Sequence, residues 1–340
     1  MTAVQPRAES GTGITREMRV AVVGAGGIGS RHIGNLLAMP EVRLEAVADL
    51  DLGRAQAQAS RGTATPFGDW RKMLDEVRPD ALLICVPPFG HGDPELAAIE
   101  RRIPFFVEKP IAVDLPTAER IATAVAAAGL ITAVGYHWRY LDIVERAREL
   151  LEDNPAHLAM GYWLDGVPPP AWWAQESQSG GQLVEQATHI LDLARYLMGE
   201  VSAVGAVAAR ADRKVPHGGD IADAYAATAV FASGAIGTFT STSLTRWPHR
   251  IGLHLVSEAM VLELSEFEIM IDIGHGRPVE RASGDPFVAE LTDFLVAASG
   301  GENRIRTPYA EALKTQRLAV AASESARRNG AVQQVDGAHG

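Results

Sequence analysis

The first half of the chain alternates short apolar runs with longer segments in which apolar residues recur every three or four positions. The short runs predict strands, and the longer segments predict amphipathic helices. Because the runs are apolar throughout, we expect strands that helices cover on both faces, as in a parallel sheet. The expected strands are 19–23, 42–49, 81–86, 105–107 and 131–134, and the first two expected helices are 28–39 and 52–60.

The second half contains runs in which apolar residues alternate with polar or small ones. This alternation predicts strands with one buried face and one face open to solvent or to another chain. Helices are expected from Gly181 and from Pro286. The expected strands are 159–164, 203–209, 224–231, 235–243, 250–255 and 259–264.

The length and net charge of the chain limit the number of domains and the kinds of partner that we expect. With 340 residues, 47% of them hydrophobic and 21% charged, the chain is long enough for about two globular domains. Its formal net charge of −11 repels phosphate backbones and anionic lipid headgroups. We therefore expect neither nucleic acid nor a membrane as a partner.

The cysteine content and the N-terminal residues indicate the cellular compartment in which we expect the protein. Cys85 is the only cysteine, so no intrachain disulfide can form, and its apolar neighbours predict a buried, inert thiol. No apolar run reaches the roughly 18 residues that span a bilayer, and residues 1–17 lack the apolar core of a signal peptide. We expect a cytoplasmic protein in which residues 1–17 form a disordered tail.

A glycine-rich segment follows the first expected strand and opens the first expected helix. In this GxGxxG spacing Gly24 permits a tight turn, Gly26 lets the backbone approach a pyrophosphate, and Gly29 lets the helix pack closely on the strand. Free N–H groups at the helix N-terminus would face the phosphates. We predict a dinucleotide-binding Rossmann fold, with the cofactor contacting Gly24, Gly26, Gly27, Ile28 and Gly29.

Asp49 ends the second expected strand. At this position a carboxylate accepts hydrogen bonds from the adenosine ribose and repels a 2′-phosphate, so the sequence favours NAD over NADP. The alternative is that Asp49 caps the helix that begins near Leu52.

Two further motifs follow later strands, where open α/β sheets bind ligands. Prolines at the end of the run 81–86 turn the backbone out over this edge, and we expect Val86, Pro87 and His91 to contact the cofactor there. For His91 a simple position at the start of a helix is the alternative interpretation.

The second of these motifs is Glu108-Lys109-Pro110, which follows the run 105–107. The proline keeps Lys109 out of helical angles and can fix a cis bond. A lysine near apolar walls suits proton transfer or polarisation of a substrate oxygen, whereas a surface Glu and Lys pair is the alternative. We expect Glu108 and Lys109 beside the cofactor, with Lys109 catalytic.

A third motif lies on the helix expected from Gly181. Glu185 and His189 are four residues apart and would share one helix face, with Asp192 three residues beyond His189. The carboxylate and the imidazole could converge on one ligand hydroxyl; a structural buried pair is the alternative. We expect no metal, because the chain has no HExxH motif and no cysteine cluster.

Together, these motifs resemble the Gfo/Idh/MocA family of glucose-fructose oxidoreductases and inositol 2-dehydrogenases. The resemblance covers roughly residues 18–335 and includes the glycine loop, Glu108-Lys109-Pro110, Gly135 to Arg139, the helix with His189, and a helix start at Pro308-Tyr309. It implies a Rossmann domain at 18–136 and an α+β domain at 137–335. That second domain would carry a large, mainly antiparallel open sheet, often used for dimer or tetramer contacts, and its C-terminal helix could pack back on the Rossmann domain.

The resemblance also implies roles for the site residues. His189 would take the hydroxyl proton, Lys109 would polarise the oxygen, and Glu185 would orient both while hydride moves to NAD from a sugar, polyol or cyclitol. The family commonly has aspartate in place of Glu185 and a smaller residue in place of Gln182.

Aromatic and basic residues after the last Rossmann strand, and in a later loop, complete the expected site. We expect Arg139 to contact the cofactor, and Tyr136, His137, Trp163, Trp172 and Trp173 to line the substrate. Their aromatic faces would suit sugar rings, although a core or interface position is an equal alternative. Two other functions remain open: an NAD-recycling glycosidase or lyase of the same fold, and a sensor without turnover.

Overall fold

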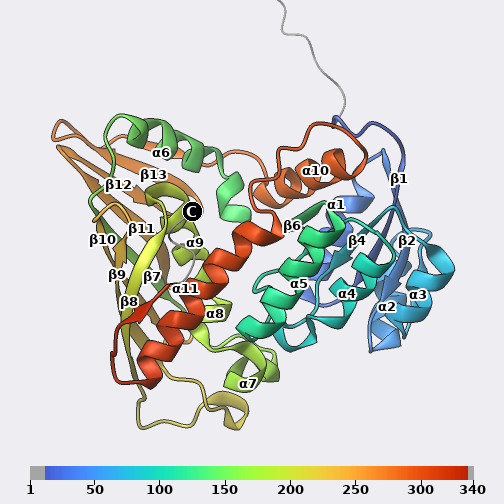
Figure 1. Cartoon of the computed structure of the whole chain (residues 1–340), viewed down its shortest axis with the longest axis horizontal. Coiled ribbons are helices and arrows are strands. Elements are labelled where there is room, and N and C mark those ends of the chain that lie inside the picture. The colour runs from blue at the N-terminus through green and yellow to red at the C-terminus, as the bar shows by residue number, and fades with distance from the viewer. Residues whose placement is uncertain (1–11, 336–340) are drawn as a thin grey trace, which may run out of the picture.

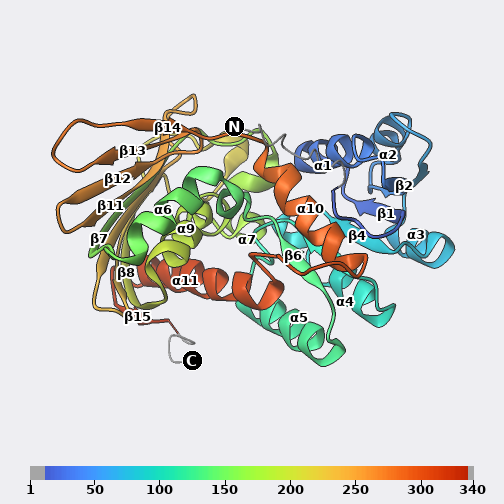
Figure 2. The same ribbon diagram turned by 90° about the horizontal axis from the view of Figure 1, so that it is seen from above.

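A computed structural model describes residues 12–335, in which two sheets stand side by side with helices packed between and around them (Figures 1 and 2). The first sheet is parallel throughout, with the strand order β3-β2-β1-β4-β5-β6. The predicted parallel sheet is therefore confirmed, and β3 is a strand that the apolar pattern missed. The strands are β1 (Met18–Val23), β2 (Val42–Ala48), β3 (Thr65–Phe67), β4 (Ala81–Ile84), β5 (Phe105–Val107) and β6 (Thr132–Val134).

Helices cover both faces of this sheet, which explains why β4, β5 and β6 are buried along their whole length. One of the covering helices, α10 (Pro286–Ala298), comes from the far end of the chain and packs Leu291, Phe294 and Leu295 into the core beside β1. The helices within the first part are α1 (Gly27–Leu37), α2 (Leu52–Ala59), α3 (Trp70–Val77), α4 (Asp93–Glu100) and α5 (Leu115–Ala128).

The second sheet is larger and mainly antiparallel, with the order β14-β13-β12-β11-β7-β10-β9-β8-β15. Only the central pair β7 and β10 is parallel. Three strands escaped prediction because they are short, exposed or acidic: β13 (Glu268–Asp272), β14 (Val279–Arg281) and β15 (Gln333–Gln334). The others are β7 (Leu158–Leu164), β8 (Val201–Ala209), β9 (Ala224–Phe231), β10 (Ile236–Thr242), β11 (Arg250–Ser257) and β12 (Met260–Leu264).

The second sheet has one covered face and one open face. Side chains of β9 and β10 alternate between buried and exposed, as the sequence pattern predicted. Three helices, α6 (Asp142–Glu152), α9 (Thr188–Met198) and α11 (Tyr309–Arg327), cover the face toward the first sheet (Figure 1). Two short helices, α7 (Glu176–Ser179) and α8 (Gln182–Glu185), lead into α9. The opposite face of the sheet carries no helix of residues 12–335 (Figure 2).

Helix α11 links the two parts. Its Tyr309 is fully buried against Phe105 of β5, and Gln316 donates a hydrogen bond to the Ala112 carbonyl before α5. Further along, Leu318 and Ala319 belong to the core beneath the second sheet. One helix thus fixes the first sheet relative to the second.

The expectation of a free N-terminal tail needs correction where the chain can be described. Residues 1–11 lie outside the described residues. Thr15, however, donates two hydrogen bonds to Ser299 at the end of α10, and Arg16 forms an ion pair with Asp80 at 3.1 Å. Within residues 12–335, no helix combines the length and the apolar character needed to cross a membrane.

Candidate functional site

A cavity of about 1250 Å³ lies between the two parts of the molecule. The first sheet contributes the glycine loop and the carboxyl ends of β2, β4 and β5, and the second part contributes three tryptophans and the start of α9. Most of the sequence-predicted site residues line this cavity. They are Gly24, Gly26, Gly27, Ile28, Asp49, Val86, Pro87, His91, Glu108, Lys109, His137, Trp163, Trp172, Trp173, Glu185 and His189.

The glycine loop leaves space where a dinucleotide needs it. Gly24 has a φ of +97°, and a Cβ there would lie 2.2 Å from the Cys85 carbonyl oxygen. At Gly29 a Cβ would lie 2.0 Å from the Gly24 carbonyl oxygen, so only glycine lets α1 approach β1 this closely. Gly26 and Gly27, by contrast, line the cavity, and a Cβ on either would meet no atom of the described chain within 4 Å. The loop therefore fits a pyrophosphate at the N-terminus of α1.

Asp49 anchors the edge of the cavity next to this loop. Its carboxylate accepts hydrogen bonds from the backbone N–H groups of Ala25 at 2.9 Å and Asp51 at 2.8 Å. The cap of α2 is Asp51, which accepts from Gly53 and Arg54, so the alternative that Asp49 caps the helix is wrong. The Arg54 guanidinium lies 3.5 Å from Asp49 and is a cation close to the same edge of the cavity.

The loop after β4 brings His91 to the cavity. Its Nδ1 lies 2.6 Å from Glu95, a side chain of α4 that also accepts a hydrogen bond from the Gly92 N–H group. The other ring nitrogen, Nε2, has no hydrogen-bond partner among the described residues. The Glu95 contact thus fixes the ring of His91 at the wall of the cavity.

Lys109 is held by Glu185 from the other side of the cavity. Its Nζ donates hydrogen bonds to the Glu185 carboxylate at 2.9 Å and to the Glu185 carbonyl at 2.6 Å. Trp173 Nε1 donates to the second carboxylate oxygen at 2.5 Å. The peptide bond between Lys109 and Pro110 is cis. These contacts hold the ammonium group at the wall of the cavity that His189 also lines.

His189 sits among aromatic rings at the inner end of the cavity. The Trp163 ring stacks on it at a centroid distance of 5.7 Å, and the His137 ring meets it edge-on at 5.0 Å. Burial, together with the nearby positive charges of Lys109 and His137, holds the pKa of His189 well below its ordinary value. The ring is therefore neutral at physiological pH and is available to accept a proton.

The expectation that Glu185 and His189 share one helix face is wrong. Glu185 ends α8, and α9 begins only at Thr188. Between them the backbone hydrogen bonds leave the α-helical pattern, because the Ala187 N–H group donates to the Gln182 carbonyl and the His189 N–H group donates to the Gln186 carbonyl. Glu185 consequently contacts Lys109 and Trp173 instead of sharing a face with His189.

Arg139 and Tyr136 are also placed differently from the sequence expectation, because neither is among the cavity-lining residues of the described chain. Arg139 forms a two-pronged ion pair with Asp192 of α9, with both N–O distances at 2.7 Å. Tyr136 is buried and its hydroxyl lies 2.8 Å from Thr188 Oγ1. Both residues support the helix that carries His189, and neither is placed to contact a cofactor or substrate.

We expect this ion pair to matter for stability. Arg139 and Asp192 are 2% and 1% exposed, so replacing Asp192 by alanine removes the two-pronged partner of a buried guanidinium and leaves Glu311, at 3.2 Å, as its remaining counter-ion among the described residues. Breaking such a pair costs about 3–5 kcal/mol of unfolding free energy. Urea denaturation of Asp192→Ala, beside the exposed carboxylate variant Glu258→Ala, measures the loss. A cost below about 1 kcal/mol would contradict a structural role for the pair.

Several cavity residues carry no motif that would have revealed them. Trp70 and Arg71 begin α3, Phe89 extends from the loop after β4 toward Trp172, and Phe287 comes from α10. Their chain positions are far apart, so only the folded arrangement brings them together. A signal in the sequence exists only for those cavity residues that belong to a local motif.

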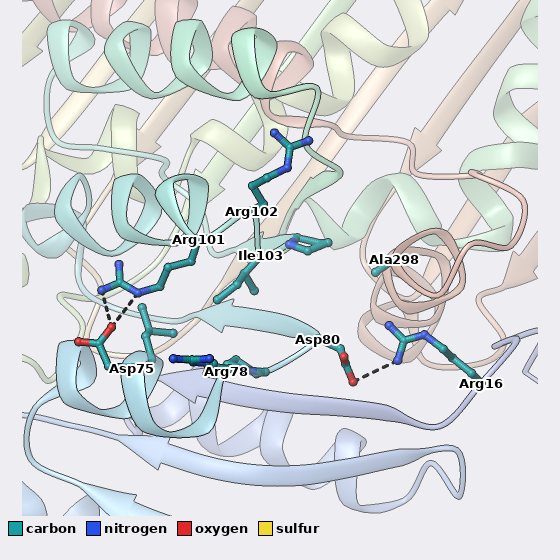
Figure 3. Close-up of a pocket in the computed structure, with 11 residues that line it drawn as sticks. Arg16, Asp75, Arg78, Asp80, Arg101, Arg102, Ile103 and Ala298 are labelled. Atoms are coloured by element: carbon teal, nitrogen blue, oxygen red, sulfur yellow. Dashed lines mark hydrogen bonds and ion pairs between the residues drawn. The ribbon is translucent and has the colours of Figure 1, made fainter.

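A second hollow, of about 660 Å³, lies at the opposite edge of the first sheet, before β4 and β5 (Figure 3). It is lined by four arginines, two of which are already paired: Arg101 with Asp75 at 2.6 Å and Arg16 with Asp80 at 3.1 Å. It contains none of the predicted motifs. Ligands of open α/β sheets bind at the carboxyl ends of the strands, so the larger cavity is the candidate site.

Comparison with protein families gives two matches. Residues 18–136 match a family described as an oxidoreductase family with an NAD-binding Rossmann fold, named GFO_IDH_MocA. Residues 153–262 match the GFO/IDH/MocA C-terminal domain. Together these matches cover the first sheet, strands β7 to β11 of the second sheet and the residues that carry His189.

Two relatives illustrate the sequence similarity. An uncharacterized oxidoreductase, YrbE, of Bacillus subtilis is 29% identical over 231 residues, which is 66% of this chain and 66% of the relative, just under two thirds of each. The myo-inositol 2-dehydrogenase of Thermotoga maritima is 27% identical over 233 residues, which is 66% of this chain and 68% of the relative.

Solved structures share the whole fold. Levoglucosan dehydrogenase in complex with NADH has a TM-score of 0.84 at 22% identity, covering 94% of this chain and 99% of that one. An oxidoreductase domain protein from Kribbella flavida has a TM-score of 0.83 at 19% identity, covering 94% of this chain and 100% of that one. Both parts of the molecule, and their arrangement, therefore recur in other proteins.

Proposed function

Because this chain belongs to the Gfo/Idh/MocA family of oxidoreductases, we propose that it is an NAD-dependent dehydrogenase of a hydroxyl-bearing carbon in a sugar, polyol or cyclitol. The observation that carries this proposal is a single cavity that joins the glycine loop to Lys109 and His189. A cofactor lying on the loop would reach these two side chains with its nicotinamide end. Acid–base groups beside a hydride acceptor are what oxidation of an alcohol requires.

The roles of the side chains follow from their contacts. NAD, when bound, supplies the acceptor for the hydride. As the C–H bond of the substrate breaks, its electron pair leaves with the hydride, and the hydroxyl proton passes to neutral His189 while the carbonyl forms. Lys109 donates a hydrogen bond to the same oxygen and stabilises the negative charge that develops there. Glu185 holds the Lys109 ammonium in place.

The walls of the cavity favour a flat, hydroxylated ring. Trp163 and Trp172 line it with aromatic faces, and Lys109, Glu185 and Gln186 add polar groups. Aromatic rings pack against the apolar faces of sugars, while polar groups bind their hydroxyls. Relatives named for inositols, and neighbours named for levoglucosan, act on molecules of this kind. We therefore place the substrate in the class of cyclic polyols and sugars.

We further propose that two or four copies associate through the open face of the second sheet. Exposed side chains on this face include Met160 at 38%, Val230 at 42% and Ile236 at 48%. A broad sheet face with exposed apolar residues suits contact with another copy.

The single thiol, Cys85, is buried, which agrees with a cytoplasmic location.

The proposed reaction is tested by its stoichiometry. A dehydrogenase forms one NADH for each molecule of ketone product, whereas an NAD-recycling glycosidase or lyase forms product without net NADH. A sensor binds both ligands and forms neither. Chromatography of the product beside NADH absorbance separates these outcomes, and product without NADH would overturn the proposal.

Cofactor choice gives a second prediction. Replacing Asp49 by serine removes the charge that repels a 2′-phosphate and also removes one of the two carboxylates that hold Arg54, so that its guanidinium can pair with that phosphate. We expect the ratio of kcat/KM for NADP over NAD to rise roughly 10- to 100-fold. The matched control is Asp51→Ser, which retains an N-cap and the Asp49 charge and should keep the preference for NAD. An unchanged ratio in Asp49→Ser would contradict the assignment.

A further inference from the structure

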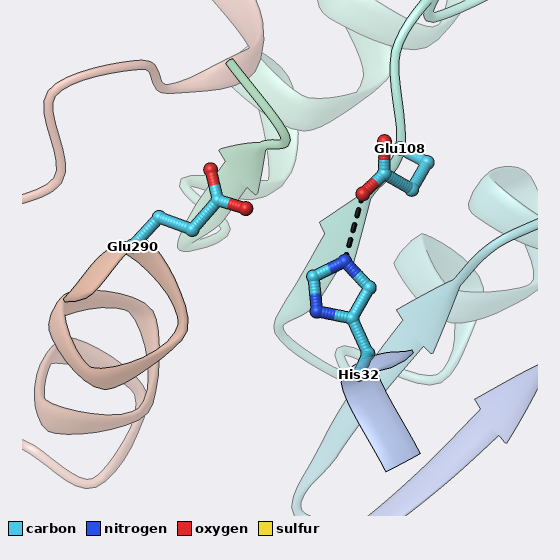
Figure 4. Close-up of side chains that lie close together, drawn as sticks. All are labelled: His32, Glu108 and Glu290. Atoms are coloured by element: carbon cyan, nitrogen blue, oxygen red, sulfur yellow. Dashed lines mark hydrogen bonds and ion pairs between the residues drawn. The ribbon is translucent and has the colours of Figure 1, made fainter. Parts of the chain in front are cut away.

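Three buried titratable side chains meet behind the Glu108–Lys109 turn (Figure 4). They are His32 of α1, Glu108 at the end of β5 and Glu290 of α10, and each has a polar atom within 4.8 Å of those of the other two. Their exposures are 0%, 5% and 1%. Neither the sequence motifs nor the proposed reaction gives these residues a joint role.

The hydrogen bonds inside this cluster are incomplete. His32 Nε2 lies 2.7 Å from Glu108 Oε1, and Glu108 Oε2 accepts from the Lys109 N–H group. His32 Nδ1 and both carboxyl oxygens of Glu290 have no partner among the described residues. Figure 4 shows the Glu290 carboxyl group facing the His32–Glu108 pair across a short gap. A buried polar atom without a hydrogen-bond partner lowers the stability of the fold. A shared proton, a water molecule or an ion in this gap would supply the missing partner.

The charges around the gap decide which carboxyl group keeps its proton. Burial and the negative charges of Glu108 and Asp285 raise the pKa of Glu290 well above its ordinary value, against a weaker effect of Arg31. Burial also opposes ionisation of Glu108, but the His32 hydrogen bond and the positive charge of Lys109 bring its pKa below the ordinary value. Two carboxyl groups this close do not both ionise in a buried site.

We propose that Glu290 is a neutral carboxylic acid that donates a hydrogen bond to the His32–Glu108 pair through one buried water, so that the cluster holds a single negative charge on Glu108. With its proton on Nε2, His32 donates to Glu108 and offers Nδ1 as an acceptor. Glu290 and His32 are then positioning residues for the Glu108 carboxylate, which lines the cofactor cavity.

This charge has a consequence for the cofactor, and here the inference rests on the proposed function. The nicotinamide ring is positively charged in NAD+ and neutral in NADH, so one fixed carboxylate at its end of the cavity stabilises the oxidised form. A second ionised carboxyl group would strengthen that preference and hinder formation of NADH. The neutral Glu290 therefore sets the balance between the two cofactor forms.

A divalent metal ion is the competing occupant of the gap. Two ligands that each bind one ion at about 2.1 Å lie roughly 3 Å or more apart. His32 Nε2 and Glu108 Oε1 lie 2.7 Å apart, which is the distance of a direct hydrogen bond. The geometry thus favours the proton over the ion.

The test measures the Kd of NAD+ and of NADH for the wild-type protein and three variants. Glu108→Gln removes the charge and should shift the ratio of the two Kd values roughly tenfold toward NADH. Glu290→Gln replaces one neutral donor by another and should leave the ratio within about twofold. Asp293→Asn removes a half-buried carboxylate of the same helix that lies outside the cluster, and should also leave the ratio unchanged.

Infrared difference spectra report the proton directly. The wild-type protein at neutral pH should show the C=O band of a buried carboxylic acid, and Glu290→Gln should lack it. The proposal is overturned if the band is absent from the wild type, if Glu290→Gln shifts the Kd ratio as far as Glu108→Gln does, or if the purified protein holds one divalent metal per chain. If neither cofactor binds the wild type, the proposed function fails, while the infrared result still tests the proton on Glu290.

Discussion

Replacing His189 by alanine is expected to lower kcat by about 10²- to 10⁴-fold, because the hydroxyl proton then has no positioned acceptor. The Kd for NAD should change by less than about threefold, since the glycine loop and Asp49 lie at the other end of the cavity. Steady-state rates together with cofactor titration by fluorescence measure both quantities.

The matched control for this variant is His275→Ala, which removes an exposed imidazole on the loop between β13 and β14. It should leave kcat and the Kd for NAD unchanged. Turnover of His189→Ala close to that of the wild type would show that another group accepts the proton, and His137, whose ring lies 5.0 Å away, would become the first candidate.

The environment of His189 also sets the pH dependence. Because its pKa in the folded protein is well below the ordinary value, His189 stays neutral, and kcat/KM should hold through the usual histidine range near pH ~6.5 and fall only below it. In the unfolded chain the ring gains a proton near that pH, so the unfolding free energy should decline as the pH drops below about 6.5. His189→Ala should reduce this decline.

Replacing Lys109 by methionine is the second large effect that we expect. The variant keeps the length of the side chain but loses the ammonium group that stabilises the developing oxyanion, and kcat should fall by about 10²- to 10³-fold. It also leaves the Glu185 carboxylate, only 14% exposed, without its cation. We therefore expect some loss of stability, measured by urea denaturation alongside the rates.

A double-mutant cycle separates the roles of Lys109 and Glu185. If Glu185 acts only by holding the ammonium group, Glu185→Gln lowers kcat less than Lys109→Met does, and the double variant is no slower than Lys109→Met alone. Additive losses would mean that Glu185 acts on the substrate independently. That outcome would contradict the geometry, in which both Glu185 carboxylate oxygens are already engaged by Lys109 and Trp173.

The first part of the fold could be predicted because its signals are local. Continuous apolar runs mark strands buried on both faces, and the glycine spacing reflects two close approaches, of Gly24 to Cys85 and of Gly29 to Gly24. The carboxyl ends of parallel strands meet at one edge, so motifs after different strands could be assigned to one cavity. In the second sheet most of the alternating strands were predicted, whereas the acidic β13 and the short, exposed β14 and β15 were not.

What could not be predicted depends on a local break or on partners distant in the chain. The interruption of the helix at Gln186 turns Glu185 toward Lys109, and no residue type at that point indicates it. Arg139 follows the end of a strand, as a residue that binds the cofactor would, but it forms an ion pair with Asp192 of α9 instead. His32 and Glu290 come from opposite ends of the chain, and only the packing of α10 on the first sheet brings them together.

The central claim is that the cavity between the two sheets transfers hydride from a hydroxyl-bearing carbon to NAD. Its most direct test is absorbance at the reduced-nicotinamide band while the purified protein is offered NAD with a panel of inositols, aldoses and glycosides. The account predicts a rise with at least one cyclic polyol or sugar, and its rate should fall by at least about 100-fold in His189→Ala and in Lys109→Met. No rise with any member of the panel, or a rise that both variants retain, would contradict it.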